Sequence, residues 1–213
     1  MPVFTFGRDR NEEFIRMARD MVNFEVSVLC EGTDDINVLT TLIEKMGIQI
    51  SKNVRLNDCG GTSELQKLAS IVATLARLSK RLERIVLIVD ADTYTPRERA
   101  DSLRQSLNSH EVDTKEPVAV SGSIYRAESE RLDFLIKITG KMDISFPRHE
   151  MEDYAVHLLI VREEVRESEL SEFQKSSDFL EHYGKKADTI IRESQEVDVK
   201  RTYENVINLL TML

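Results

Sequence analysis

The chain has 213 residues, of which 41% are hydrophobic, so it is long enough to bury a core and to form one or two domains. No apolar segment approaches the roughly 20 residues that span a bilayer, and the polar first residues are not typical of a signal peptide, so we expect no membrane association. The net charge of −9 argues against a free-standing protein that holds nucleic acid by charge alone, because such proteins are more often basic.

Helical and strand-like segments alternate in the first half of the chain. Apolar residues at helical spacing predict helices over 9–22, 33–46, 62–80 and 96–108, and short apolar runs predict strands over 24–30, 53–59 and 84–92. Several residues are typical of helix ends, namely Asp9 or Asn11, Thr33, Gly47, Ser63, Gln66, Thr95, Pro96 and Glu98. Cys30 and Cys59 end predicted strands and fit buried, reduced thiols in a cytoplasmic protein.

The second half of the chain is predicted with less detail. Residues 117–125 and 132–139 each read as a strand, with a helical turn or loop at 126–131. Charged segments at 149–164, 169–183 and 186–212 are predicted helices. We therefore expect an N-terminal helix (1–23), an α/β domain (24–160) and a helical C-terminal extension (161–213) that packs back on the sheet.

Strands joined by helices through short links predict right-handed crossovers and a doubly wound, Rossmann-like parallel sheet flanked by helices. Ligands of such sheets bind beyond the carboxyl ends of the strands. Three predicted strands end in polar residues there: Glu31 and Gly32, then Asp58, then Asp90 and Asp92. We therefore expect several carboxylates to meet at one edge of the sheet.

Asp90 and Asp92 are separated by one residue, Ala91, so in extended geometry both side chains point to one side and can share a cation. Oxygen ligands of this kind suit Mg²⁺ or Mn²⁺. Gly60 and Gly61 precede a predicted helix, where backbone N–H groups can receive a phosphate. A substrate with phosphates needs such a metal, a basic patch or a partner subunit to offset the negative net charge.

Glu31, Gly32 and Asp35, followed after a long gap by an apolar strand ending in Asp90 and Asp92, resemble the TOPRIM domain. This fold is shared by type IA and type II topoisomerases, bacterial primases, recombination-repair proteins and OLD-family nucleases. The resemblance covers roughly residues 24–160. The segment 149–159, "HEMEDYAVHLL", is similar to the acidic helix start of OLD-type and small stand-alone TOPRIM proteins.

The resemblance implies a role for each matching residue. Glu31 would be the general acid/base or a metal-organising group, and Asp35 would be a supporting ligand of the metal. Asp90 and Asp92 would bind Mg²⁺ or Mn²⁺, and Glu152 would be an acid at a second metal position. Together with Gly60 and Gly61, Gly32 is an expected phosphate-binding position.

The chain has no segment like the zinc-binding, helicase or DNA-gate regions of primases and topoisomerases, which leaves a stand-alone, nuclease-like protein. The expected function is therefore a Mg²⁺-dependent phosphodiesterase that acts on nucleic acid. The OLD-type resemblance also allows a partner ATPase, and a homo-oligomer is a further expectation. The alternatives are a non-catalytic module that binds nucleotide, nucleic acid or protein, and a small-molecule phosphohydrolase.

Each of these residues also has a purely structural explanation. Asp35 can be a helix-start charge favoured by the macrodipole, and Glu152 with Asp153 can begin a helix. The glycine pair Gly60 and Gly61 can serve a turn alone. The basic residues in 77–84 fit a solvated helix end as well as a basic patch.

Overall fold

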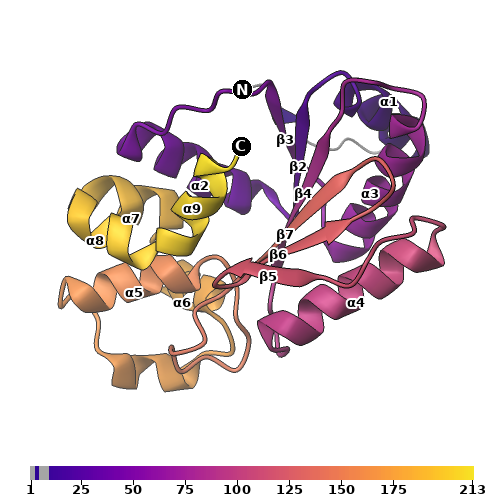
Figure 1. The fold of residues 1–213 in the computed structure, drawn as a ribbon. Coiled ribbons are helices and arrows are strands. Elements are labelled where there is room, and N and C mark those ends of the chain that lie inside the picture. Colours follow the sequence, from indigo (N-terminus) through magenta and orange to yellow (C-terminus); the bar gives the residue numbers. More distant parts are fainter. Residues whose placement is uncertain (1–2, 5–9) are drawn as a thin grey trace.

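The computed structural model describes residues 3–4 and 10–213 (Figure 1). Over these residues the chain forms one seven-stranded sheet with the order β1-β3-β2-β4-β7-β6-β5. Five of the strands run parallel to one another and two form an antiparallel hairpin at one edge. The strands are β1 (Val3–Phe4), β2 (Val26–Cys30), β3 (Val54–Asp58), β4 (Arg84–Asp90), β5 (Val118–Ser121), β6 (Ile124–Glu128) and β7 (Asp133–Thr139).

Helices cover both faces of the sheet, and each face has its own hydrophobic core (Figure 1). The three helices on one face are α1 (Arg10–Met21), α3 (Thr62–Ala76) and α4 (Pro96–Ser109). The other face carries α2 (Thr33–Met46) and the C-terminal helices α5 (Asp153–Val161), the 3₁₀ helix η1 (Glu167–Glu172), α6 (Ser176–His182), α7 (Ala187–Glu193), α8 (Glu196–Thr202) and α9 (Glu204–Thr211). The predicted α/β class, with a mostly parallel sheet flanked by helices and a helical C-terminal part, is confirmed.

Strand β4 is the central strand of the seven-stranded sheet, and its side chains are apolar on both faces. Val86 and Ile88 pack in one core, and Leu87 and Val89 pack in the other. All four side chains are essentially inaccessible to solvent. A strand that is buried on both faces reads as a continuous aliphatic run, which is the pattern that predicted it.

The helix ends agree with the prediction at some positions and differ at others. Thr95 caps α4 through the predicted capping box with Glu98, and Gly47 ends α2 in the left-handed conformation. The expected cap at Thr33 is wrong, because Gly32 occupies that position and the Thr33 hydroxyl donates to Asp58 instead. The capping box at Ser63 is also wrong: the N-cap of α3 is Gly61, two residues earlier, so Ser63 lies inside the helix. Asp9 lies outside the described residues.

The region after residue 110 differs most from the prediction. Residues 126–128 continue strand β6, where a helical turn or loop was expected, and Gly122 with Ser123 forms the turn of the β5–β6 hairpin. The predicted C-terminal region is helical, but its helices are shorter and more numerous: 169–183 contains most of η1 and all of α6, and 186–212 is divided into α7, α8 and α9. Their buried residues, among them Phe179, Tyr203 and Leu209, belong to the same core as Val28 of β2. The C-terminal helices therefore pack back on the sheet, as expected.

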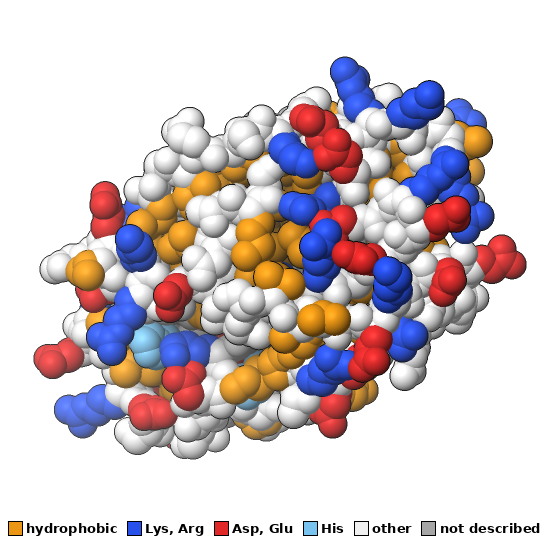
Figure 2. Space-filling view, viewed as in Figure 1, with side chains coloured by type: hydrophobic (Ala, Val, Ile, Leu, Met, Phe, Trp, Pro, Cys, Tyr) orange, Lys and Arg blue, Asp and Glu red, His pale blue; other side chains and the backbone are white. Residues whose placement is uncertain are grey.

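The face of the molecule in Figure 2 carries acidic and basic side chains interspersed, with apolar residues between them. Across the described part of the chain, no helix has both the length and the apolar composition needed to cross a membrane.

Candidate functional site

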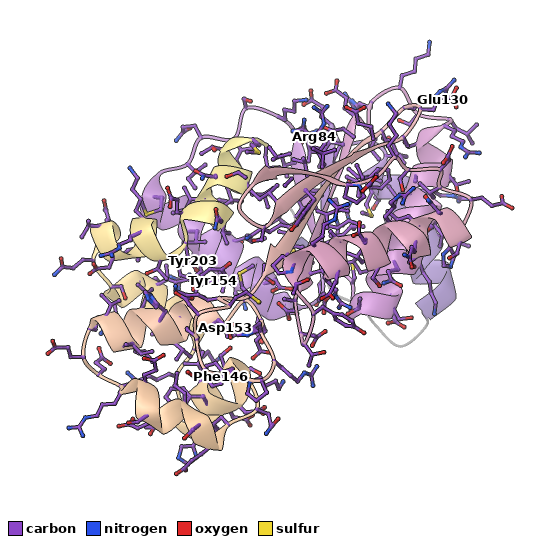
Figure 3. The ribbon with its side chains drawn as sticks, turned by 60° about the horizontal axis from the view of Figure 1, so that its bottom comes forward. Arg84, Glu130, Phe146, Asp153, Tyr154 and Tyr203 are labelled. Atoms are coloured by element: carbon purple, nitrogen blue, oxygen red, sulfur yellow. The ribbon has the colours of Figure 1, made fainter. Side chains whose placement is uncertain are left out.

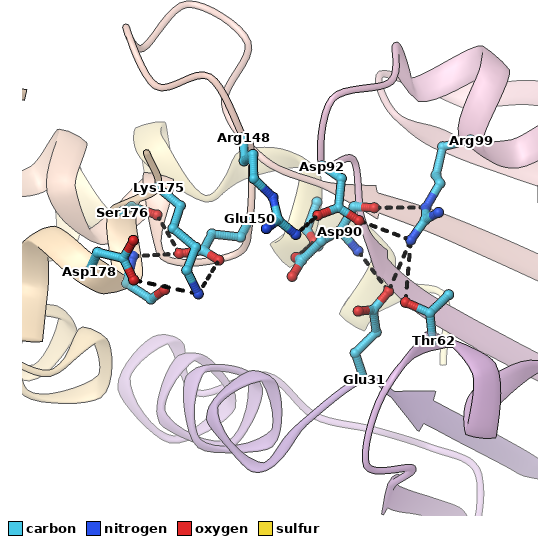
Figure 4. A network of polar contacts seen from close by, with 12 residues as sticks. Glu31, Thr62, Asp90, Asp92, Arg99, Arg148, Glu150, Lys175, Ser176 and Asp178 are labelled. Atoms are coloured by element: carbon cyan, nitrogen blue, oxygen red, sulfur yellow. Dashed lines mark hydrogen bonds and ion pairs between the residues drawn. The ribbon is translucent and has the colours of Figure 1, made fainter. Parts of the chain in front are cut away.

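The carboxyl ends of β2, β3 and β4 meet at one edge of the sheet. Cys30 pairs with Asp58 on one side and with Ile88 on the other, so the three strands end almost level. Glu31 follows β2 directly, and its Oε1 accepts a hydrogen bond from the backbone N–H of Asp90 at 3.3 Å. The predicted convergence of Glu31 and Asp90 is therefore found in the structure (Figure 4).

A shallow cleft of about 300 Å³ opens at this edge. Six of the residues predicted for the site line it, and so do four others. The predicted residues are Glu31, Gly32, Asp35, Gly61, Asp90 and Glu152, and the others are Thr33, Asp34, Glu150 and Ser177. Residues 31–35 come from the start of α2 and residues 150–152 from the segment before α5, so the cleft lies between these two elements and the end of β4.

Asp90 is held in place by two donors. Its Oδ1 accepts hydrogen bonds from the Thr139 hydroxyl at 2.6 Å and from the backbone N–H of Met151 at 3.0 Å. Burial raises the pKa of Asp90 well above its ordinary value, and the nearby charges of Asp35 and Glu31 raise it further. Asp90 is thus a fixed carboxyl group in a negatively charged environment.

The other acidic residues of the cleft also have raised pKa values. The pKa of Asp35 is raised to about 7, chiefly by burial. The hydrogen bond from the Gly32 N–H lowers this pKa, and the charge of Glu31 raises it. Burial likewise raises the pKa of Glu152 to about 8, assisted by Glu150 and Asp35. Burial raises the pKa of Glu31, while Thr62 and Arg99 oppose the shift. The cleft therefore gathers carboxyl groups that destabilise one another when ionised.

These raised pKa values predict that stability falls as the pH rises. The folded pKa values of about 7 for Asp35 and about 8 for Glu152 lie above the ordinary value of about 4 for an unfolded chain. The folded state then binds more protons than the unfolded state between about pH 4 and pH 8, so this contribution is complete at low pH and lost through that window. Thermal unfolding of the metal-free chain at pH 6 and pH 8.5 should show the decrease.

A double variant, Asp35→Asn with Glu152→Gln, supplies the control for this measurement. Because both substituted side chains are neutral throughout, the decrease in melting temperature between the two pH values should be much smaller in the double variant. An equal decrease in parent and variant would show that other groups cause it.

Asp92 lies at the same edge but contacts different groups. Its Oδ2 is 3.2 Å from Nη2 of Arg99, and its Oδ1 is 2.7 Å from Nη2 of Arg148 (Figure 4). Strand β4 ends at Asp90, and Asp92 has a φ of 54°, so the extended geometry that would direct both carboxylates to one side is not kept. The shared cation between Asp90 and Asp92 stays a prediction, and in this arrangement both oxygens of Asp92 are paired with arginines.

The three glycines predicted to bind phosphate donate their N–H groups within the protein. Gly32 donates to Asp35, Gly60 donates to Oδ1 of Asp58 at 2.9 Å, and Gly61 donates to the carbonyl of Glu31 at 2.7 Å. Gly60 and Gly61 have φ values of 73° and 125°, which residues with a side chain rarely adopt. The turn alone accounts for this pair, and phosphate binding by the three glycines stays a prediction.

Arg99 is a central residue of the site that the sequence analysis did not identify. Its guanidinium contacts the backbone carbonyl of Asp90 at 3.0 Å, Oγ1 of Thr62 at 3.3 Å and Oε1 of Glu31 at 3.5 Å, in addition to Asp92. The position was available from the sequence, because Pro96 starts α4 and the first turn of that helix places Arg99 against the end of β4.

The segment before α5 is tied to β4 through its backbone. Asp92 and His149 exchange two backbone hydrogen bonds, at 2.9 and 2.8 Å, in an isolated β-bridge. Asp153 is fully buried and accepts from the backbone N–H of Lys141 at 2.9 Å and from the Ser176 hydroxyl at 2.8 Å, and its Oδ2 lies 2.9 Å from Nδ1 of His149. These contacts place Glu152 at the cleft. Figure 3 shows Asp153 far from Arg84 and Glu130, which mark the opposite end of the sheet.

The cleft is not a preformed metal centre. Among the described residues, no three His, Cys, Asp or Glu side chains are already arranged to hold a metal ion. The donor set nevertheless has the chemistry that a hard divalent cation requires, because the acidic side chains of the cleft supply only oxygen ligands. A cation would also relieve the mutual repulsion that raises the pKa values of Asp35, Asp90 and Glu152.

The fold and the cleft together define a mixed α/β protein with an acidic cleft at the carboxyl edge of its parallel strands. The chain belongs to the family described as proteins of unknown function (DUF3226), whose model matches residues 25–186. Its fold is similar to that of a hypothetical protein from Pyrococcus horikoshii OT3, with 14% sequence identity and a TM-score of 0.60 over 87% of this chain and 98% of that one. None of the curated proteins matches the chain.

Proposed function

We propose that the protein is a Mg²⁺- or Mn²⁺-dependent phosphodiesterase of TOPRIM type that acts on nucleic acid. The observation that carries this proposal is the hydrogen bond between Glu31 and the backbone of Asp90, in a cleft that also contains Asp35 and Glu152. The two strands that carry the TOPRIM-like motifs thus end side by side. A cleft with these groups at the carboxyl edge of a parallel sheet is where an α/β enzyme binds its substrate.

Asp90, Asp35 and Glu152 would hold the divalent cation. When bound, such an ion neutralises negative charge on a phosphodiester and activates water as a nucleophile. The chain's own contribution is to keep Asp90 fixed through Thr139 and Met151 and to keep Glu152 at the cleft through the bridge at His149. A fixed carboxyl group loses less conformational freedom when it acquires a ligand.

Glu31 is the candidate general acid/base. Burial raises its pKa above the ordinary value of a glutamate, and a raised pKa favours a carboxyl group as a general acid/base. Arg99, 3.5 Å away, stabilises the carboxylate form, and the Asp90 N–H holds one oxygen. In this role Glu31 takes a proton from the attacking oxygen or gives one to the leaving oxygen.

The second candidate function is a module that binds nucleotide, nucleic acid or protein without turnover. Two observations favour it: the described acidic residues do not form a ready metal site, and Asp92 is paired with arginines. Calorimetric titration with Mn²⁺, followed by a cleavage assay, separates the two functions, because metal binding without cleavage supports the module.

The test of the proposal is a nuclease assay on single- and double-stranded DNA and RNA, with Mg²⁺, with Mn²⁺ and with EDTA. We expect cleavage in the presence of metal only, and a decrease of roughly 10²- to 10⁴-fold for Glu31→Gln, the usual contribution of a general acid/base. Glu130→Gln is the matched control, since Glu130 is exposed at the opposite end of the sheet (Figure 3). Cleavage by Glu31→Gln at the parent rate would reject the role of Glu31, and no cleavage of any substrate would reject the proposal.

A further inference from the structure

Arg148 is an exposed arginine held at the edge of the cleft by a single carboxylate. Its side chain is 53% exposed, and one nitrogen, Nη2, lies 2.7 Å from Asp92. Among the residues that the structure describes, Asp92 is the only acceptor bonded to this guanidinium. An arginine has five N–H donors in a planar fork, so most of the donors of Arg148 remain available to a ligand.

Glu150 and Asp178, two acidic residues near Arg148, have partners of their own. Figure 4 shows the Arg148 side chain between Glu150 and Asp92. Glu150 accepts hydrogen bonds from the Ser176 hydroxyl and the Ser177 N–H, and its Oε2 lies 3.9 Å from Nζ of Lys175. Lys175 also pairs with Asp178 at 3.7 Å. Among the described residues, neither Glu150 nor Asp178 forms an ion pair with the Arg148 guanidinium, which is bonded to Asp92 alone.

The backbone fixes the relation between Arg148 and Asp92. The β-bridge joins Asp92 to His149, the residue after Arg148, and the N–H of Arg148 donates to the carbonyl of Gln174 at 3.1 Å. Asp92 is held in a left-handed backbone conformation that is uncommon for a residue with a side chain. Such conformations persist where the surrounding contacts determine them, and they cluster at functional sites.

We propose that Arg148 binds a phosphate of the nucleic-acid strand beside the cleft and that Asp92 serves to orient Arg148 and Arg99 and does not bind the cation. The inference rests on the proposed function for its substrate class. In this role Arg148 supplies the local positive charge that a chain with a net charge of −9 needs in order to hold a polyanion. Asp90 and Asp92, although separated by only one residue, then have different roles: Asp90 binds the cation and Asp92 orients the arginines.

The first experiment measures binding of labelled single-stranded DNA, single-stranded RNA and duplex DNA by fluorescence anisotropy. Ca²⁺ replaces Mg²⁺ in one series and EDTA is present in another, and each Kd is measured at several salt concentrations. We expect Arg148→Ala to weaken binding by about 3- to 10-fold and to reduce the salt slope by about one phosphate contact, roughly 0.7 for a single strand and 0.9 for a duplex. Arg148→Lys should keep the slope and lose part of the affinity, because lysine keeps the charge without the planar fork.

Arg126→Ala is the matched control. Its side chain is 49% exposed and is also paired with an aspartate, Asp133, at 2.7 Å, but it lies on β6 away from the cleft. This variant should bind as the parent does. An unchanged Kd and slope for Arg148→Ala, or a parent chain that binds none of the probes, would overturn the inference.

The role of Asp92 is tested by two further measurements. In the Asp92→Asn background, Arg148→Ala should weaken binding less than it does in the parent, because Arg148 is no longer oriented. Calorimetric titration should find Mn²⁺ affinity within about threefold of the parent for Asp92→Asn and at least about 100-fold weaker for Asp90→Asn. Equal losses in both backgrounds, or loss of Mn²⁺ binding by Asp92→Asn, would overturn the orienting role.

The binding and cleavage results separate this inference from the proposed function. A chain that binds the probes through Arg148 but never cuts them would end the phosphodiesterase proposal and leave the phosphate contact standing. If the parent cuts nucleic acid but Arg148→Ala leaves binding and the salt slope unchanged, the phosphate contact is rejected and the phosphodiesterase proposal stands.

Discussion

Asp90→Asn is expected to abolish metal-dependent cleavage, lowering the rate by at least about 10³-fold, while the fold remains intact. The substitution removes the charge that a cation requires but keeps an oxygen that can accept from Thr139 and from the N–H of Met151. Because Asp90 is buried among Asp35 and Glu31, whose charges raise its pKa, the neutral amide should also remove a repulsion. We therefore expect the metal-free variant to melt at or above the temperature of the parent at pH 8.

The measurements are a nuclease assay and a thermal melt in EDTA. Asp113→Asn serves as the control, because Asp113 is exposed and lies beside Glu130, at the end of the sheet opposite the cleft. An Asp90→Asn variant that cuts at the parent rate would show that Asp90 has no role in the chemistry. A variant that unfolds would show that the carboxylate is needed for the fold.

Asp153→Ala is expected to cause the largest loss of stability, on the order of 3–5 kcal/mol. The carboxylate is fully buried and is the acceptor for the Lys141 N–H and the Ser176 hydroxyl, and it lies beside the His149 ring. Its removal leaves the partly buried N–H of Lys141 and the His149 ring without this acceptor, and leaves the Ser176 hydroxyl with Glu150 alone. Each buried polar group that loses its partner costs about 1–3 kcal/mol. The loss is a large part of the 5–15 kcal/mol that typically stabilises a protein.

Urea unfolding of the parent and of three variants measures this effect. Ser176→Ala should cost only about 1 kcal/mol, because Asp153 keeps its other donors and Glu150 keeps the Ser177 N–H when the Ser176 hydroxyl is removed. The exposed control Asp113→Ala should be within about 0.5 kcal/mol of the parent. A loss below about 1 kcal/mol for Asp153→Ala would mean that the segment before α5 is held by other contacts.

The convergence of Glu31 with Asp90 was predictable from the sequence. Both residues follow aliphatic runs, and parallel strands that alternate with helices bring their carboxyl ends to one edge. Glu152 was predicted at the cleft from the TOPRIM resemblance alone. The structure places it there through the bridge between Asp92 and His149, a contact between residues too far apart in the chain for a local pattern to indicate.

The arginine contacts of Asp92 were not predictable from local patterns. They depend on β4 ending at Asp90, on the left-handed backbone at Asp92 and on Arg148, which arrives from a distant part of the chain. The β5–β6 hairpin, by contrast, had a usable signal, because Gly122 and Ser123 lie between two apolar runs and glycine suits the positive φ of 52° in that turn. The expected turn at 126–131 gave too much weight to the charged residues Arg126 and Glu128, which lie on strand β6.

The most direct test of the central claim is a crystal soaked in Mn²⁺ and measured at a wavelength where manganese scatters anomalously. We expect an anomalous peak in the cleft, within ligand distance of Asp90 and of Asp35 or Glu152, and a weaker or absent peak in Asp90→Asn crystals. No peak in the cleft of the parent, or a peak bound elsewhere, would contradict the claim that these carboxylates hold a divalent ion together.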